Sequence, residues 1–163
     1  MTFRIEVLDD DSLELRHLDA LEVDVLLRVP ELLESRDPRV RDRLLPAAYD
    51  DPDDEQQWRS LVVPELEHLF ASRTEIVRKD LAGIAVESRG GGFRLKIPSA
   101  HRSAWESAMT GASHVLYLLA GLAPGDTTLE PGDLGDPDRD VALYRIRVLG
   151  YLLSEILDLD GYN

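Results

Sequence analysis

The chain has 163 residues, of which 44% are hydrophobic and 31% charged, and it contains no cysteine. We expect one domain over residues 1–163, because a single core suffices up to roughly 250 residues. The 32 acidic and 18 basic residues give a formal charge of −14, and the arginines stand singly or in pairs between acids. This charge disfavours binding to nucleic acid or an anionic membrane. Disulfides and thiolate sites are excluded. With no signal peptide or apolar span of about 20 residues in the sequence, we expect a cytoplasmic protein.

Alternating apolar residues predict a small antiparallel sheet. Residues 1–17 are typical of a β-hairpin, since Phe3, Ile5 and Val7 alternate with charged residues before an acidic turn and a second alternating run. A third strand is expected over residues 93–98, after a run of glycines. Because an isolated hairpin is marginal in water, helices must cover its apolar face.

Residues 18–86 are expected to be helical, with starts marked by aspartate and proline. Asp37 with Pro38, and Asp51 with Pro52, each place an N-cap before a proline at the first helical position. Pro30 is expected to kink or restart an earlier helix. From Pro64, apolar residues at helical spacing predict a longer amphipathic helix.

The C-terminal half predicts two core helices separated by a loop. A helix capped by Ser99 is expected over residues 99–122, an acidic loop rich in proline and glycine over 123–138, and a C-terminal core helix over 139–158. The last helix is apolar around most of its circumference, which places it at the centre of the bundle or shares it with a homodimer contact. The predicted fold class is α+β, predominantly helical, with five to six helices packed on a two- or three-stranded antiparallel sheet.

The stretch RLLPAAYDDPDDEQQWRSL, residues 43–61, carries the strongest functional candidates. As a partner-binding surface it would use an aromatic pair with nearby charges, because exposed Trp, Tyr and Arg carry much interface energy. The favoured alternative buries both rings against the bundle and folds two arginines back on two aspartates as a structural clasp. The clasp would join Arg43 and Arg59 to Asp51 and Asp54. The six candidate residues are Arg43, Tyr49, Asp51, Asp54, Trp58 and Arg59.

Patterns that suggest metal chemistry are incomplete. Glu65 and His68 have the Glu-x-x-His spacing of a di-iron bundle site. The chain has no second copy of that motif, and His68 falls opposite the apolar stripe, so a solvated polar face is favoured. Asp136, Asp138 and Asp140 have the spacing of the first ligands of a calcium-binding loop. The later positions lack the residues that such a loop needs, so a helix cap at Asp138 is favoured. We therefore expect no metal and no cofactor.

Three longer strings resemble one protein family. The strings are DPRVRDRLLPAAYDDPDDEQQWRSLVVPE, GGFRLKIPSAHRSAWESAM and DVALYRIRVLGYLLSEIL. Together, in this order, they resemble the bacterial, mainly actinobacterial family of domain of unknown function 2017 (DUF2017). The genes of that family often lie beside the gene for the Clp adaptor ClpS, which implies, by association only, a role near Clp-dependent proteolysis. The resemblance brings no enzymatic activity.

The chain departs from the family pattern in one place. The family typically has an Asn-Asp-Leu-Arg run soon after the helical tryptophan, and this chain has Thr110, Gly111, Ala112 and Ser113 there. Any function of that run is put in doubt for this protein.

Taken together, these features favour a non-enzymatic cytosolic interaction or regulatory protein with a protein partner of unknown identity. The alternative is a metal-dependent enzyme that uses carboxylates of the 50–55 acidic cluster and a histidine. A DNA-binding regulator is disfavoured by the charge.

Overall fold

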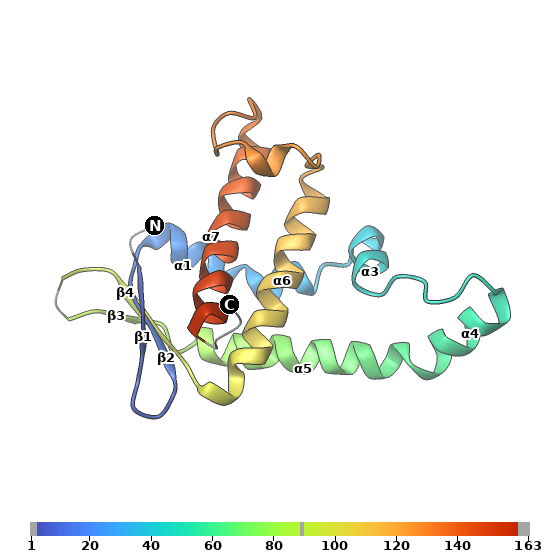
Figure 1. The fold of residues 1–163 in the computed structure, drawn as a ribbon, viewed down its shortest axis with the longest axis horizontal. Coiled ribbons are helices and arrows are strands. Elements are labelled where there is room, and N and C mark those ends of the chain that lie inside the picture. Colours follow the sequence, from blue (N-terminus) through green and yellow to red (C-terminus); the bar gives the residue numbers. More distant parts are fainter. Residues whose placement is uncertain (1–2, 89, 160–163) are drawn as a thin grey trace.

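The computed structural model describes residues 3–88 and 90–159, and in that part of the chain four strands form one antiparallel sheet in the order β1-β2-β4-β3 (Figure 1). The predicted hairpin and third strand are both present. The sheet has one strand more than expected, because two residues inside the segment assigned to helices pair with β4. A two-residue strand is too short to show an alternating pattern. The strands are β1 Arg4–Val7, β2 Leu13–Leu18, β3 Ala85–Val86 and β4 Phe93–Ile97.

The apolar face of the sheet comes from paired positions on β2 and β4. Leu13 lies opposite Ile97, and Leu15 lies opposite Leu95, and all four side chains are fully buried. The register then shifts, so that Leu18 is also buried three residues after Leu15. A bulge makes this possible because it inserts a residue and re-aims the strand.

The first helices begin where the caps predict. α1 (Ala20–Leu27) starts with a capping box in which Asp19 and Glu22 each accept a hydrogen bond from the other's backbone N–H. The helix is interrupted at Arg28, and a new helix, α2 (Val29–Leu33), begins with Pro30 in its first turn. α3 and α4 each begin with a proline that directly follows a capping aspartate. Their bounds are Pro38–Leu44 for α3 and Pro52–Leu61 for α4.

Three long helices make up most of the helical part: α5 (Val63–Leu81), α6 (Arg102–Leu119) and α7 (Pro137–Leu159). α6 and α7 lie side by side, and α5 crosses below them (Figure 1). Ser99 does not cap α6 with its side chain: a 3₁₀ turn, Ser99–His101, comes first, and α6 starts without a side-chain cap. A second 3₁₀ turn, Asp126–Thr128, lies in the acidic loop before α7.

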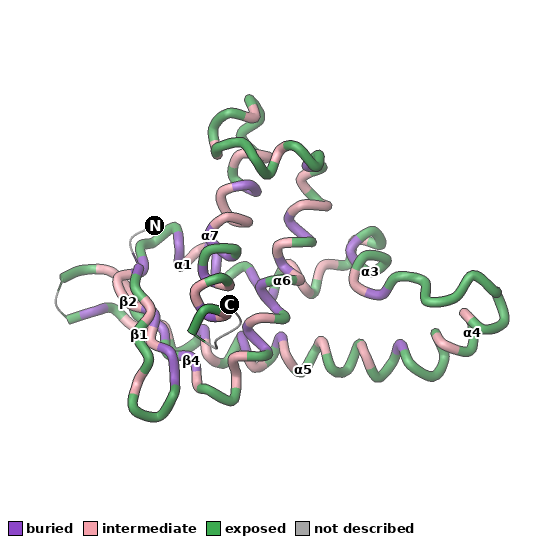
Figure 2. Tube along the Cα trace, in the orientation of Figure 1, coloured by how far each residue is buried: buried purple, intermediate pink, exposed green. Residues whose placement is uncertain are grey.

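The core joins the sheet to α1, α5, α6 and α7. Trp105 of α6 is the largest fully buried side chain, and its indole N–H donates to Asp80 of α5 at 2.9 Å. α7 contributes Val148, Leu149 and Leu152, among others, to the same cluster. The C-terminal helix therefore packs in the internal core on that side. Figure 2 shows that buried residues gather where these elements meet.

A projecting segment leaves this core. The 46–51 connection, α4 and the first part of α5, residues 46–69, extend away from the rest of the molecule (Figures 1 and 2). We call this segment the arm and the remainder the body. α4 has no buried residue, and its main packing partner is α5.

The architecture confirms the predicted fold class, α+β and predominantly helical. Within the described residues, none of the helices combines the length and the apolar character needed to cross a membrane.

Candidate functional site

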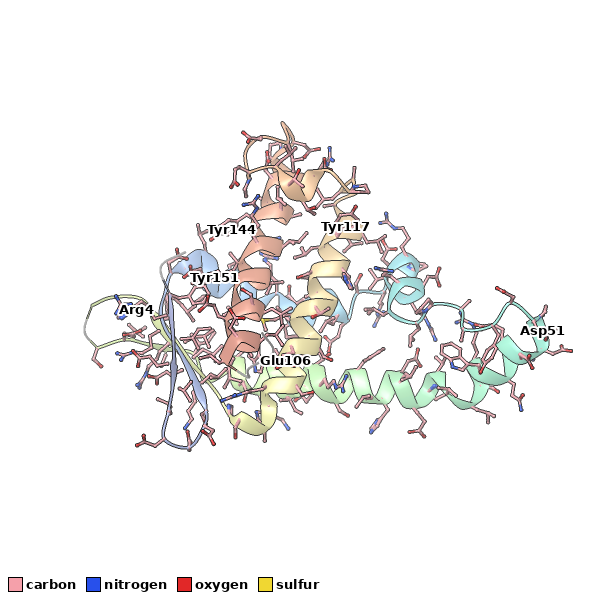
Figure 3. All side chains as sticks on the ribbon, in the orientation of Figure 1. Arg4, Asp51, Glu106, Tyr117, Tyr144 and Tyr151 are labelled. Atoms are coloured by element: carbon pink, nitrogen blue, oxygen red, sulfur yellow. The ribbon has the colours of Figure 1, made fainter. Side chains whose placement is uncertain are left out.

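The tip of the arm is built by local capping. Asp51 accepts hydrogen bonds from the backbone N–H groups of Asp53 at 2.9 Å and Asp54 at 3.1 Å. The acids of the first turn stand where the partial positive charge of a helix N-terminus favours them. Asp51 lies at the far end of the arm in Figure 3. The cap and the start of α4 agree with the sequence prediction.

The predicted clasp, in which Arg43 and Arg59 pair with Asp51 and Asp54, is wrong. Arg59 pairs with Glu55, with 2.6 Å between Nε and Oε1, and not with Asp51 or Asp54. Arg43 forms no ion pair with a described residue. The reason is geometric: Glu55 and Arg59 are four residues apart on one helix face, whereas the side chain of Asp51 is already used as a cap.

Glu55 also accepts hydrogen bonds from the connection that precedes α4. Its second oxygen accepts the backbone N–H of Tyr49 at 3.0 Å and of Ala48 at 2.9 Å. These hydrogen bonds, the one from Tyr49 first, and the charge of Arg59 hold the pKa of Glu55 below its usual value of 4.5. Glu55, which the sequence placed only in the first turn, is therefore the residue that closes the arm tip.

Five of the six predicted partner-binding residues lie on the arm, and Arg43 lies on α3. Trp58 is half-buried, with the Arg59 guanidinium carbon 6.0 Å from the centre of its ring. Tyr49 is exposed, so the expected burial of both rings against the bundle is not found. Further apolar side chains of the arm are also exposed, namely Leu61, Val62 and Leu69.

The candidate metal ligands do not form a metal-binding group in the described residues. Glu65 and His68 are both exposed on α5. Among residues 3–88 and 90–159, no group of three or more His, Asp or Glu side chains is placed to hold a metal ion. In the calcium-like run it is Asp136 that accepts the first N–H groups of α7, while Asp140 accepts those of Gly132 and Leu134 and so closes the loop.

A cavity of about 600 Å³ lies where the arm joins the body. Its walls come from the end of α2, α3, α5 and α6, and α3 and α5 both pack on α6 (Figure 1). The apolar side chains of the lining are Leu33, Pro38, Val40, Leu44, Leu45, Phe70, Ala71 and Ala108. Gly111 of α6 also lines it, and Leu33 packs so close to this glycine that an added Cβ would lie 2.8 Å from Leu33 Cδ2.

Among the charged side chains around this cavity, arginines outnumber acids. Glu67 pairs with Arg41 at 2.7 Å, and Glu34 pairs with Arg78 at 2.6 Å. Arg36 and Arg73 also line the cavity, and neither forms an ion pair with a described residue. The half-buried Arg73 donates from Nη1 to Ser107 Oγ at 3.0 Å. Both acids at the cavity are thus paired, and two arginines are left over.

Sequence reasoning missed this cavity because its lining comes from four separate segments, each of which follows an ordinary helical pattern. It also missed the cluster in which Asp80 accepts from Trp105 and lies 3.0 Å from Nδ1 of His101. The helical spacing of Trp105 indicated only burial. In the run that departs from the family pattern, Gly111 lines the cavity, Ala112 is buried, Ser113 is half-buried and Thr110 is exposed.

Comparison with known proteins identifies a family. The family model described as domain of unknown function (DUF2017) matches residues 5–159. No curated protein matches the chain, and no solved structure does. The matched range contains β1 from its second residue onward, the other three strands, the helices of the described residues and all the candidate residues above. The chain belongs to the DUF2017 family.

Proposed function

We propose that this protein is a non-enzymatic interaction protein that binds a protein partner through the arm. The single observation that carries the proposal is a helix without a buried residue, α4, held away from the core beside exposed apolar side chains. A helix of this length is marginal in water by itself. Its cap and the hydrogen bonds of Glu55 to the preceding connection favour the helical conformation.

The side chains of the arm are of the kind that stabilise protein interfaces. Aromatic and large apolar residues at the centre of an interface contribute most of its binding energy. Trp58 is half-buried and Tyr49, Leu61 and Val62 are exposed, so they can be buried further by a partner. The fixed geometry lowers the entropy that binding costs.

The charge of the arm adds a requirement for the partner. Residues 46–69 contain seven acidic side chains and one arginine. Such a surface favours a basic partner and speeds its association at low salt. We therefore propose a partner whose contact surface is apolar at the centre and basic at the rim.

The resemblance to a family whose genes often lie beside the ClpS gene makes proteins of the Clp machinery the first partners to test. This support is by association. A cytoplasmic location is part of the same proposal.

The experiment compares partner capture by the wild type and by two variants with the same substitution. Leu61 on the arm is 65% exposed and Leu21 on α1 is 64% exposed, so Leu61→Glu and Leu21→Glu make the same chemical change at equally exposed sites. Quantitative mass spectrometry of captured proteins from source cells should find a partner with the wild type and with Leu21→Glu, and should show at least a roughly tenfold loss with Leu61→Glu.

Two results would contradict the proposal. One is that no protein is captured above background. The other is that every captured protein is retained by Leu61→Glu as well as by Leu21→Glu. Circular dichroism and thermal melting of both variants verify that the body remains folded.

A further inference from the structure

We infer that the cavity at the base of the arm binds a small amphipathic carboxylate, a molecule with an apolar body and one carboxylate group. This goes beyond the proposed function, because the cavity lies where the arm joins the body and none of the exposed arm residues Tyr49, Leu61, Val62 or Leu69 lines it.

The size and lining of the cavity fit a small molecule. Its volume of about 600 Å³ lies within the range of small-molecule sites, roughly 300–1,000 Å³. Helices α3, α5 and α6 supply apolar walls, including Val40, Phe70 and Ala108. Burial of an apolar body against these walls would supply most of the binding energy.

The charge at the cavity selects an anion. In a chain of formal charge −14, two arginines line one apolar cavity without a carboxylate partner among the described residues. The acids beside them, Glu34 and Glu67, are each paired with a different arginine. A guanidinium binds a planar carboxylate with two parallel hydrogen bonds. Arg73 is half-buried and positioned by Ser107, so a carboxylate there would meet an arginine that is already oriented.

The ion pairs at the wall favour a small molecule over a peptide. Arg41–Glu67 and Glu34–Arg78 tie the 34–41 segment to α5 at two points that are eleven residues apart on α5, about 16 Å along a helix. A peptide laid along α5 would have to pass beneath or break these pairs. A small molecule fits between them.

The test uses dodecanoate below its micelle concentration, measured by isothermal titration calorimetry. We expect saturable binding of one dodecanoate per chain. The uncharged dodecanol should bind at least about tenfold more weakly, because it cannot accept the two parallel hydrogen bonds that a guanidinium donates to a carboxylate.

Variants identify the site and separate charge from fold. The double variant Arg36→Gln/Arg73→Gln should lose the preference for dodecanoate over dodecanol, whereas Arg28→Gln/Arg94→Gln makes the same charge change at exposed sites that do not line the cavity and should keep it. Ala71→Trp places a large side chain in the cavity and should abolish binding of both ligands. Thermal melting verifies the fold of each variant.

Several outcomes would overturn the inference. They are no saturable binding of dodecanoate to the wild type, equal affinity for dodecanol, or an undiminished preference in Arg36→Gln/Arg73→Gln. A peptide of alternating leucine and glutamate is titrated as the competing kind of ligand. If the peptide binds in a way that Ala71→Trp removes, while dodecanoate does not bind, the cavity is a peptide site and the inference is wrong.

Discussion

The body and the arm contain the same kinds of residue but are stabilised in different ways. In the body, Trp105 is fully buried and its indole N–H is bonded to Asp80. In the arm, Trp58 is only half-buried and lies beside Arg59. The body is stabilised by burial of apolar surface from distant segments, whereas the arm is held by caps and by hydrogen bonds between near neighbours in sequence.

This difference indicates where binding can evolve without loss of the fold. Changes in the arm remove few tertiary contacts, so its surface can be altered at little cost to global stability. A substitution in the body should therefore destabilise the fold more than a matched substitution in the arm.

The largest difference is expected between the two tryptophans. Trp105→Ala should lower the free energy of unfolding by about 3–5 kcal/mol, because it leaves a cavity in the core and removes the indole hydrogen bond to Asp80. Trp58→Ala should lower it by less than about 1 kcal/mol. Urea denaturation of both variants measures this. Similar losses would mean that the arm belongs to the same cooperative core.

A smaller difference is expected between two glutamates. Glu87 is buried beside β2, where it accepts the N–H of His17 at 2.6 Å and a hydrogen bond from Arg16 at 3.2 Å. These contacts, the His17 bond first, lower its pKa from the usual 4.5. Ionised Glu87 therefore stabilises the fold above pH 4.5, and this stabilisation is lost as the pH falls through the lowered pKa.

Glu87→Gln should accordingly lower the melting temperature at pH 7, and its difference from the wild type should shrink at pH 3. Glu55→Gln, although the pKa of Glu55 is lowered as well, should leave the melting temperature nearly unchanged at both pH values. It should instead speed hydrogen exchange at the amides of Ala48 and Tyr49. A difference for Glu87→Gln that persists undiminished at pH 3 would refute the assigned role of the charge.

The smallest difference is expected between two helix caps. Asp19 caps α1 in the body, and Asp51 caps α4 in the arm. Asp19→Ala should lower the free energy of unfolding by about 1 kcal/mol. Asp51→Ala should fray α4, seen as faster exchange of its first amides, with almost no change in the global unfolding transition. Equal global effects would contradict the independence of the arm.

Features that depend on near neighbours were predictable. The helix starts at Pro38 and Pro52 follow from an aspartate and a proline in adjacent positions. The alternating residues of β1, β2 and β4 give the sheet its apolar face. Ser99 does not cap α6, because a 3₁₀ turn comes between them. Arg59 pairs with Glu55 and not with the predicted aspartates, because Glu55 lies one helical turn before it and the Asp51 side chain caps the helix.

The fold class, the family resemblance and the capped helix starts can all be read from the amino-acid sequence, because propensity, capping and periodicity act within a few residues. Three features could not be read from it: α4 projects from the core, β3 joins the sheet, and a cavity with two surplus arginines opens between α3, α5 and α6. These features depend on how segments far apart in the chain pack together, and that packing is set by the sum of many weak contacts that no single stretch of sequence contains.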